Sequence, residues 1–137
     1  MDYSSGVAAF EAKNFSHAMR LLSPLADAGN ADAQHRVAIM CQNGLGVVRN
    51  ELRAYKMMKA AAEQGYAIAQ HGLGFMYLEG ECVEQSSAQA AEWFRRAGEQ
   101  GLAGSLTTLA LMYQEGNGVD KDPEEARRLY AEAGFDM

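Results

Sequence analysis

Two histidines at equivalent positions are the residues of this sequence best suited to chemistry. His35 and His71 each follow an Ala-Gln pair and lie 36 residues apart. Paired imidazoles can hold a metal ion or exchange protons with a substrate. A shared metal is disfavoured, because packed helices lie about 10 Å apart and no third ligand of a usual type lies nearby in the sequence. The sequence therefore predicts no metal site and no cofactor.

The common catalytic signatures are missing from the chain. It contains no GxSxG, HExxH or GxxxxGK[ST] motif and no dinucleotide-binding fingerprint. Carboxylates gather at Asp120, Asp122, Glu124 and Glu125. This stretch reads as a loop and a first helical turn, where acidic residues favour the helix dipole. We therefore predict that the chain is not an enzyme and has no catalytic residue.

The composition limits the classes of partner. The net charge is -6, and no Lys/Arg cluster offers the basic stripe typical of nucleic-acid binders. No apolar run reaches the roughly 18 to 20 residues of a membrane helix, so no membrane insertion is expected. A cytoplasmic location fits the chain as given, whereas a periplasmic or secreted one would follow if a signal peptide had been removed. The expected partner is another protein or peptide.

Two cysteines, Cys41 and Cys82, form neither a CxxC motif nor a zinc spacing. Cys41 takes the position that Tyr77 and Tyr113 occupy one and two periods later, which indicates a buried small side chain. A disulfide is disfavoured, because the two positions fall in different repeats and on different elements.

A period of 36 residues organises the elements that must position these side chains. Small, apolar and Gly positions recur at this spacing without an insertion, and a repeat of this length is one supersecondary unit that must stack on its neighbours. We expect one repeat domain over 1–137, with a short opening helix pair at 3–29 and full repeats at 31–66, 67–102 and 103–137. The recurring positions are Ala33, Ala69 and Ser105; Gly44, Gly80 and Gly116; Val47, Val83 and Val119; and Ala54, Ala90 and Ala126.

Each full repeat reads as two helices joined by a short loop. The opening pair is expected at 3–12 and 15–28, and the first helices of the full repeats at 31–42, 67–79 and 103–115. Gly44, Gly80 and Gly116 suit left-handed helix ends, and the three valines of the period should anchor the loops in the core. Cys82 replaces the second Gly of its loop and would be strained there. Helix caps are expected at Asn30, Asn50, Ser86 and Asp122, with capping-box partners at Gln89 and Glu125 and Pro123 in the first turn.

The motif of the middle repeat resembles the Sel-like repeat (SLR) family, a branch of the tetratricopeptide-like helical repeats. The chain departs from that pattern at Val37, Ala38 and Cys41 in the repeat at 31–66 and at Cys82 in the middle repeat. The resemblance implies an all-α fold, an α/α solenoid of about four antiparallel helix pairs in a right-handed superhelix. It also implies a scaffold or adaptor, often in bacterial signalling, envelope assembly or host interaction. The residues that carry it are Ala67, Ala69, Leu73, Gly74, Met76, Tyr77, Gly80, Val83, Ala90, Trp93, Phe94, Ala97, Gln100 and Gly101.

The same resemblance places a partner-binding groove along the first helix of each pair. Ile39, Phe75 and Leu111 share one phase and would form an apolar line for a peptide or helix, flanked by His and amide groups. The competing interpretation is that these side chains are buried between helices. The predicted groove residues are Asp32, His35, Ile39 and Gln42; Ile68, His71, Phe75 and Leu78; and Thr107, Leu111 and Gln114, with Gly104 at the same phase.

Two alternatives stay open at this point. The first is a small hydrolase or a cell-wall ligand binder that uses the face of His35 and His71. The second concerns the last repeat, where Phe135 either folds over the helix pair or leaves a surface for self-association.

Overall fold

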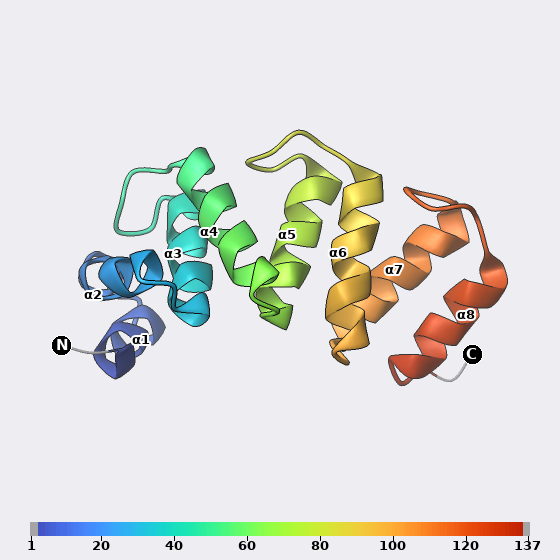
Figure 1. Ribbon diagram of the computed structural model, residues 1–137, viewed down its shortest axis with the longest axis horizontal. Helices are drawn as coiled ribbons and strands as arrows, with labels where there is room; N and C mark the ends of the chain where they lie inside the picture. The colour runs from blue at the N-terminus through green and yellow to red at the C-terminus, as the bar shows by residue number, and fades with distance from the viewer. Residues whose placement is uncertain (1–2, 136–137) are drawn as a thin grey trace. The chain divides into compact units, whose positions relative to one another are not determined.

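The computed structural model describes residues 3–135, and these residues form eight α-helices and no strand (Figure 1). The expected all-α class is therefore confirmed, and each expected helix is found within two residues of its predicted end. The helices are α1 (Tyr3–Glu11), α2 (Phe15–Asp27), α3 (Ala31–Asn43), α4 (Glu51–Glu63), α5 (Ala67–Glu79), α6 (Ser87–Glu99), α7 (Ala103–Glu115) and α8 (Pro123–Glu132).

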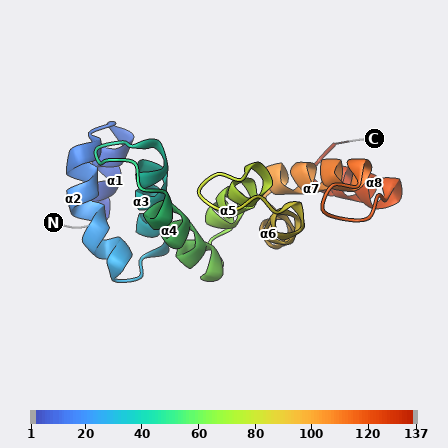
Figure 2. The same cartoon turned by 90° about the horizontal axis from the view of Figure 1, so that it is seen from above.

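The helices fall into two compact units. Unit 1 spans Met1–Tyr66 and holds α1 to α4, and unit 2 spans Ala67–Met137 and holds α5 to α8. Within each unit, every helix packs against the next one in the chain, which Figure 2 shows from above. None of the helices within residues 3–135 combines the length and apolarity needed to cross a bilayer.

Small residues let paired helices approach closely. Ala38, Ala54, Ala90 and Ala110 are fully buried at the crossings. Gly74 on α5 faces Phe94 on α6, and a β-carbon at Gly74 would lie 2.7 Å from Cε1 of that ring. The close crossing of α5 and α6 is therefore a steric reason for a glycine inside this helix.

The helix caps were predicted correctly, but the capping box was not. The side chains of Asn30, Asn50, Ser86 and Asp122 each accept a hydrogen bond from the amide three residues on. The capping-box prediction requires the amides of Ser86 and Asp122 to bond the side chains of Gln89 and Glu125. They donate instead to the carbonyls of Tyr77 and Tyr113, at 2.8 and 2.9 Å. The preceding helix therefore satisfies these amides, because the loop folds back onto its end.

The inter-helix loops share one backbone path. Gly44, Gly80 and Gly116 all have φ near +70°, as their expected role at helix ends requires. The loop valines Val47, Val83 and Val119 are half-buried. The valines were expected in the core, and they are therefore less deeply buried than predicted.

Both cysteines are thiols in the structure. Cys41 is fully buried on α3, as its repeat position indicated. Burial raises the pKa of the Cys41 thiol, so the uncharged, unreactive form is favoured.

Replacing Cys82 by glycine should stabilise the protein. Cys82 has φ of +67°, a left-handed conformation that costs an L-residue about 1 kcal/mol or more. The greater freedom of glycine in the unfolded chain offsets part of this gain. We expect Cys82→Gly to raise the melting temperature by about 1 to 2 °C. Cys82→Ser keeps the β-carbon and should give no gain, and a lower melting temperature for Cys82→Gly would refute the prediction.

Candidate functional site

The predicted groove residues of unit 1 lie on α3 and are all half-buried. These residues are Asp32, His35, Ile39 and Gln42. The His35 ring meets Tyr66 edge to face at 5.7 Å between centroids, and burial lowers the pKa of His35. His35 is therefore held neutral against an aromatic ring.

Asp32 is the centre of a hydrogen-bond network within unit 1. Tyr3 donates to its Oδ2, Arg36 Nε donates to the same oxygen at 2.8 Å, and Tyr66 donates to Oδ1 at 2.7 Å. Burial raises the pKa of Asp32, but the three donors outweigh it and the net shift is downward. This carboxylate therefore ties α1 and the end of unit 1 to α3, and its oxygens already have donors within the chain.

The network makes a prediction at alkaline pH. Burial and the hydrogen bond to Asp32 raise the pKa of Tyr66 to about 12. Since the unfolded value is about 10, the stability that the neutral phenol contributes is complete below about pH 10 and is lost as the pH rises towards 12. A near-ultraviolet absorbance titration should show a late tyrosine that disappears in Tyr66→Phe and titrates earlier in Asp32→Asn. Ionisation of Tyr66 near pH 10 in the wild type would contradict this.

The predicted residues of unit 2 lie on α5 and α7, and two of the large apolar ones are open to solvent. Ile68 is 49% exposed and Leu111 is 45% exposed, while Phe75 is half-buried. Phe75 meets His71 and Phe94 edge to face, each at 5.0 Å. We call this surface, made of Ile68, His71, Phe75 and Leu111, the first-helix face of unit 2. None of its residues is sealed from solvent, so an interpretation as pure core does not hold.

The remaining predicted residues of unit 2 lie around this face. Leu78 and Thr107 are half-buried, whereas Gly104 and Gln114 are exposed. Thr107 donates to the Gly104 carbonyl at 3.0 Å, and Gln114 accepts from the Tyr130 hydroxyl at 3.2 Å. These two polar side chains therefore make contacts within their own helix pair.

His71 connects the two first helices of unit 2. Its Nδ1 lies 2.6 Å from Oγ of Ser105, which is 0% exposed on α7. Burial lowers the pKa of His71, so the neutral ring is favoured. Serine and histidine at this distance could form a nucleophilic pair, but no substrate can reach a fully buried hydroxyl. The pair therefore joins α5 to α7.

Sequence reasoning missed a pair of glutamine contacts. Gln64 Nε2 donates to Gln34 Oε1 and Gln100 Nε2 donates to Gln70 Oε1, both at 2.9 Å. Gln34 and Gln70 are buried, and Gln34 also donates to the Ala26 carbonyl at 3.1 Å. All four glutamines recur at the 36-residue period, and this recurrence was the signal. The third repeat has Leu106 at the position of Gln34 and Gln70.

Two surface hollows lie on unit 2 outside the first-helix face. One has a volume of about 130 Å³ and is lined by Gln114, Pro123, Ala126, Arg127 and Tyr130. The other has a volume of about 180 Å³ and lies among α6, α7 and α8. Its lining residues are Arg95, Glu99, Leu106, Leu109, Arg128, Leu129 and Glu132.

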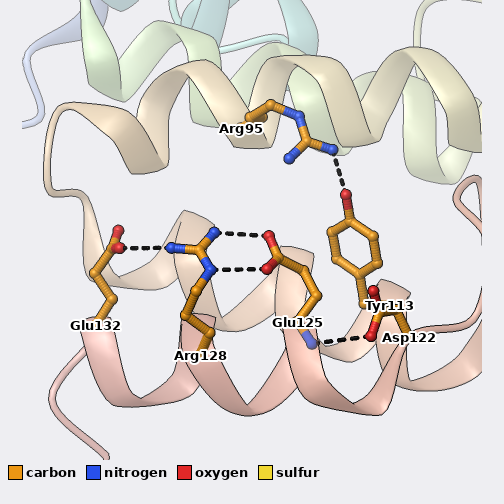
Figure 3. A network of polar contacts seen from close by, with 6 residues as sticks. All are labelled: Arg95, Tyr113, Asp122, Glu125, Arg128 and Glu132. Carbon is orange, nitrogen blue, oxygen red and sulfur yellow. Dashed lines mark hydrogen bonds and ion pairs between the residues drawn. The ribbon is translucent and has the colours of Figure 1, made fainter.

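Ion pairs of Arg128 and a hydrogen bond of Arg95 lie beside the second hollow (Figure 3). Arg128 contacts both oxygens of Glu125 at 2.6 and 2.7 Å and reaches Glu132 at 3.2 Å, while Arg95 donates to the Tyr113 hydroxyl at 2.7 Å. The Arg128 hydrogen bonds lower the pKa of Glu125. The ion pairs of Arg128 therefore lie along α8, and the Arg95–Tyr113 bond joins α6 to α7. Among the described residues, no group of three or more His, Cys, Asp or Glu could hold a metal ion.

Phe135 folds back at the end of α8. Its amide donates to the Tyr130 carbonyl at 2.9 Å, and the two rings meet edge to face at 6.5 Å. The Phe135 side chain nevertheless stays 54% exposed, so the choice between the two alternatives for the last repeat stays a prediction. Self-association stays a prediction, and a monomeric mass by light scattering at high concentration would contradict it.

Comparison with solved structures identifies close relatives of the fold. The chain is similar to a Sel1 repeat protein from Oxalobacter formigenes, with 32% identity and a TM-score of 0.91, over 96% of this chain and 54% of that one. It is also similar to a protective antigen present in uropathogenic Escherichia coli strains that displays an SLR fold, with 36% identity and a TM-score of 0.80, over 82% of this chain and 24% of that one. The chain thus spans about half and a quarter of these two relatives.

A third structure supports the fold alone. Helicobacter pylori cysteine rich protein B is 19% identical with a TM-score of 0.64, over 82% of this chain and 85% of that one. The comparison with curated proteins gave no match. These likenesses confirm the α/α solenoid class that the sequence resemblance implied.

A family model described as the Sel1 repeat matches residues 3–30, 31–66, 67–102 and 105–134. Proteins of this kind are usually protein-interaction modules and are generally non-enzymatic scaffolds. The resemblance drawn from the middle repeat is confirmed: the chain belongs to the Sel1 repeat family.

Proposed function

We propose that this chain binds a partner peptide or helix on the exposed side of its first helices, and that it works as a protein–protein scaffold or adaptor without catalytic activity. One observation carries the proposal. Ile68 on α5 and Leu111 on α7 are large apolar side chains that stay about half exposed, and the half-buried Phe75 shares their helical phase. Exposed apolar side chains that gather on one face mark interaction sites more often than isolated ones do.

The way α5 and α7 are joined supports a preformed surface. The His71–Ser105 contact and the close approach of Gly104 to the His71 ring hold the two helices side by side. Gly104 has no side chain, and a β-carbon there would lie 3.4 Å from Cε1 of the His71 ring. A partner would therefore meet a surface that does not have to reorganise, which favours affinity.

The hydrolase alternative has weaker support. Among residues 3–135 the one Ser–His hydrogen bond is that of His71 with Ser105, whose hydroxyl is fully buried and closed to a substrate. Loss of ligand binding or of activity in His71→Ala, with binding of a protein partner unchanged, would favour this alternative.

Site-specific photo-crosslinking tests the proposal. A photoreactive amino acid at position 68 or 111 should capture a partner that the same group at position 52 does not. Leu52 on α4 is the matched control, since it is 63% exposed and outside the predicted groove. Ile68→Asp and Leu111→Asp should then abolish binding of that partner, and Phe75→Ala should weaken it. Equal loss in Leu52→Asp, or no loss in Ile68→Asp, would refute the proposal.

A further inference from the structure

The first-helix face of unit 2 differs from the rest of its surface in charge. From Ala67 to Leu78 and from Ala103 to Gln114, α5 and α7 carry no Asp, Glu, Lys or Arg. The first charged residue of each helix is its last residue, Glu79 on α5 and Glu115 on α7, and both are exposed. Each lies four residues after an apolar residue of the face, Phe75 or Leu111, so each carboxylate falls on the same side of its helix.

These two carboxylates lack the neutralising partners that others in unit 2 have. On α6 and α8, arginines pair with Glu92, Glu124 and Glu125. Within the described residues, Glu79 and Glu115 form no ion pair. The C-terminal end of a helix adds its own partial negative charge at the same place. The apolar face therefore ends in two carboxylates that form no ion pair among the described residues, with Lys121 as the basic side chain in the loop beside Gly116.

The two helix ends belong to one surface. Gly118, in the loop after α7, lies against Ser87, the residue that begins α6 after the α5 loop, and a β-carbon added at Gly118 would lie 2.4 Å from the Ser87 carbonyl oxygen. At the other end of these helices, the approach of Gly104 to His71 brings together the N-terminal halves of α5 and α7. The helices thus lie side by side in the same direction, with Glu79 and Glu115 at one end.

We infer that the partner of this face is a peptide segment with apolar side chains for Ile68, Phe75 and Leu111 and with Lys or Arg at the end that lies over Glu79 and Glu115. This inference rests on the proposed function and adds the partner's chemistry. Complementary charge at the edge of an apolar contact sets orientation and speeds association. An acidic segment would meet repulsion at the same place.

Selection from a phage-displayed random peptide library on the full chain tests this inference. Selected peptides should carry Lys or Arg on one side of an apolar pair. As synthetic peptides in fluorescence anisotropy, they should bind about two- to fivefold more weakly to Glu79→Gln and to Glu115→Gln at low salt. The loss should shrink as salt is added. The matched control is Glu99→Gln, which removes an exposed carboxylate from the end of α6 and should bind as the wild type does.

The outcomes separate the two proposals. Two results would overturn this inference and leave the proposed function intact. The first is that peptides whose binding depends on Ile68 and Leu111 contain no basic residue. The second is that such peptides bind Glu79→Gln and Glu115→Gln as tightly as the wild type. Peptides that bind Ile68→Asp as well as the wild type, or a library that yields no binder, would overturn both. Far-ultraviolet circular dichroism of each variant confirms that the helices are retained.

Discussion

Gly118→Ala is expected to lower the free energy of unfolding by about 2 to 5 kcal/mol. Gly118 has φ of +75°, which costs an L-residue about 1 to 2 kcal/mol. In addition, a β-carbon there would lie 2.4 Å from the Ser87 carbonyl oxygen and 2.5 Å from its carbonyl carbon. Backbone cannot yield as a flexible side chain can, so the loop must move away from the start of α6.

Gly101→Ala is the control that separates the two causes. Gly101 has φ of +91°, but no atom lies within 4 Å of the place that a β-carbon would take. Its substitution should therefore cost only the conformational part, about 1 to 2 kcal/mol. Denaturant unfolding followed by Trp93 fluorescence suits both variants, because this buried residue is the single Trp of the chain and lies in the same unit. Equal costs for Gly118→Ala and Gly101→Ala would refute the close approach.

Unit 1 repeats the test independently. A β-carbon at Gly46 would lie 2.4 Å from the Phe15 carbonyl carbon and 2.5 Å from the Ser16 amide nitrogen. Phe15 is the first residue of α2, and Ser87 is the first residue of α6. In each unit, a glycine in the loop of the second helix pair therefore lies against the start of the second helix of the first pair. Gly29, with φ of +105° and no atom within 4 Å of a β-carbon, is the control there.

These glycines show which part of the fold the sequence could predict. The 36-residue recurrence placed Gly44, Gly80 and Gly116 at helix ends, because φ above zero is a local property with a residue signature. The approach of Gly46 and Gly118 to a neighbouring hairpin is a tertiary contact between segments about 30 residues apart. A glycine required by such a contact looks the same in the sequence as one required by a turn.

The polar contacts show a similar limit. The caps Asn50, Ser86 and Asp122 were predictable, since a cap bonds an amide only three residues away. The Asp32 network was not, because its donors Tyr3 and Tyr66 come from opposite ends of unit 1. Asp32 was therefore predicted as a groove residue from its helical phase alone, and phase does not reveal which distant side chains arrive at the same place.

The candidate site was predictable in the same uneven way. Helical phase predicted that Ile68, Phe75 and Leu111 share a side, and the structure leaves all three accessible. Phase could not predict that His71 and Ser105 join α5 to α7, because Ser105 replaces the alanines of the other repeats at a position that reads as core. A polar residue at an apolar repeat position was the available signal.

Gly74→Ala should destabilise unit 2, although alanine favours a helix by about 1 kcal/mol over glycine. A β-carbon at Gly74 would lie 2.7 to 2.9 Å from three atoms of the Phe94 ring. That ring is fully buried and is flanked by Phe75 at 5.0 Å and His71 at 5.6 Å, so it has little room to tilt. Overpacking of this kind costs about 1 to 3 kcal/mol, which exceeds or cancels the gain in helix propensity.

A double-mutant cycle with Phe94→Met makes the prediction sharp. In the preceding repeat, the positions equivalent to Gly74 and Phe94 are Ala38 and Met58. In the last repeat they are Ala110 and Tyr130, and the Tyr130 ring is only half-buried, so it has room to move. Once Phe94 is replaced by the thinner, flexible methionine, Gly74→Ala should change from destabilising to stabilising by about 1 kcal/mol. The two substitutions should therefore couple by about 2 kcal/mol in thermal or denaturant unfolding. If Gly74→Ala stabilises the protein in the presence of Phe94, the contact between α5 and α6 is not what keeps this position free of a side chain.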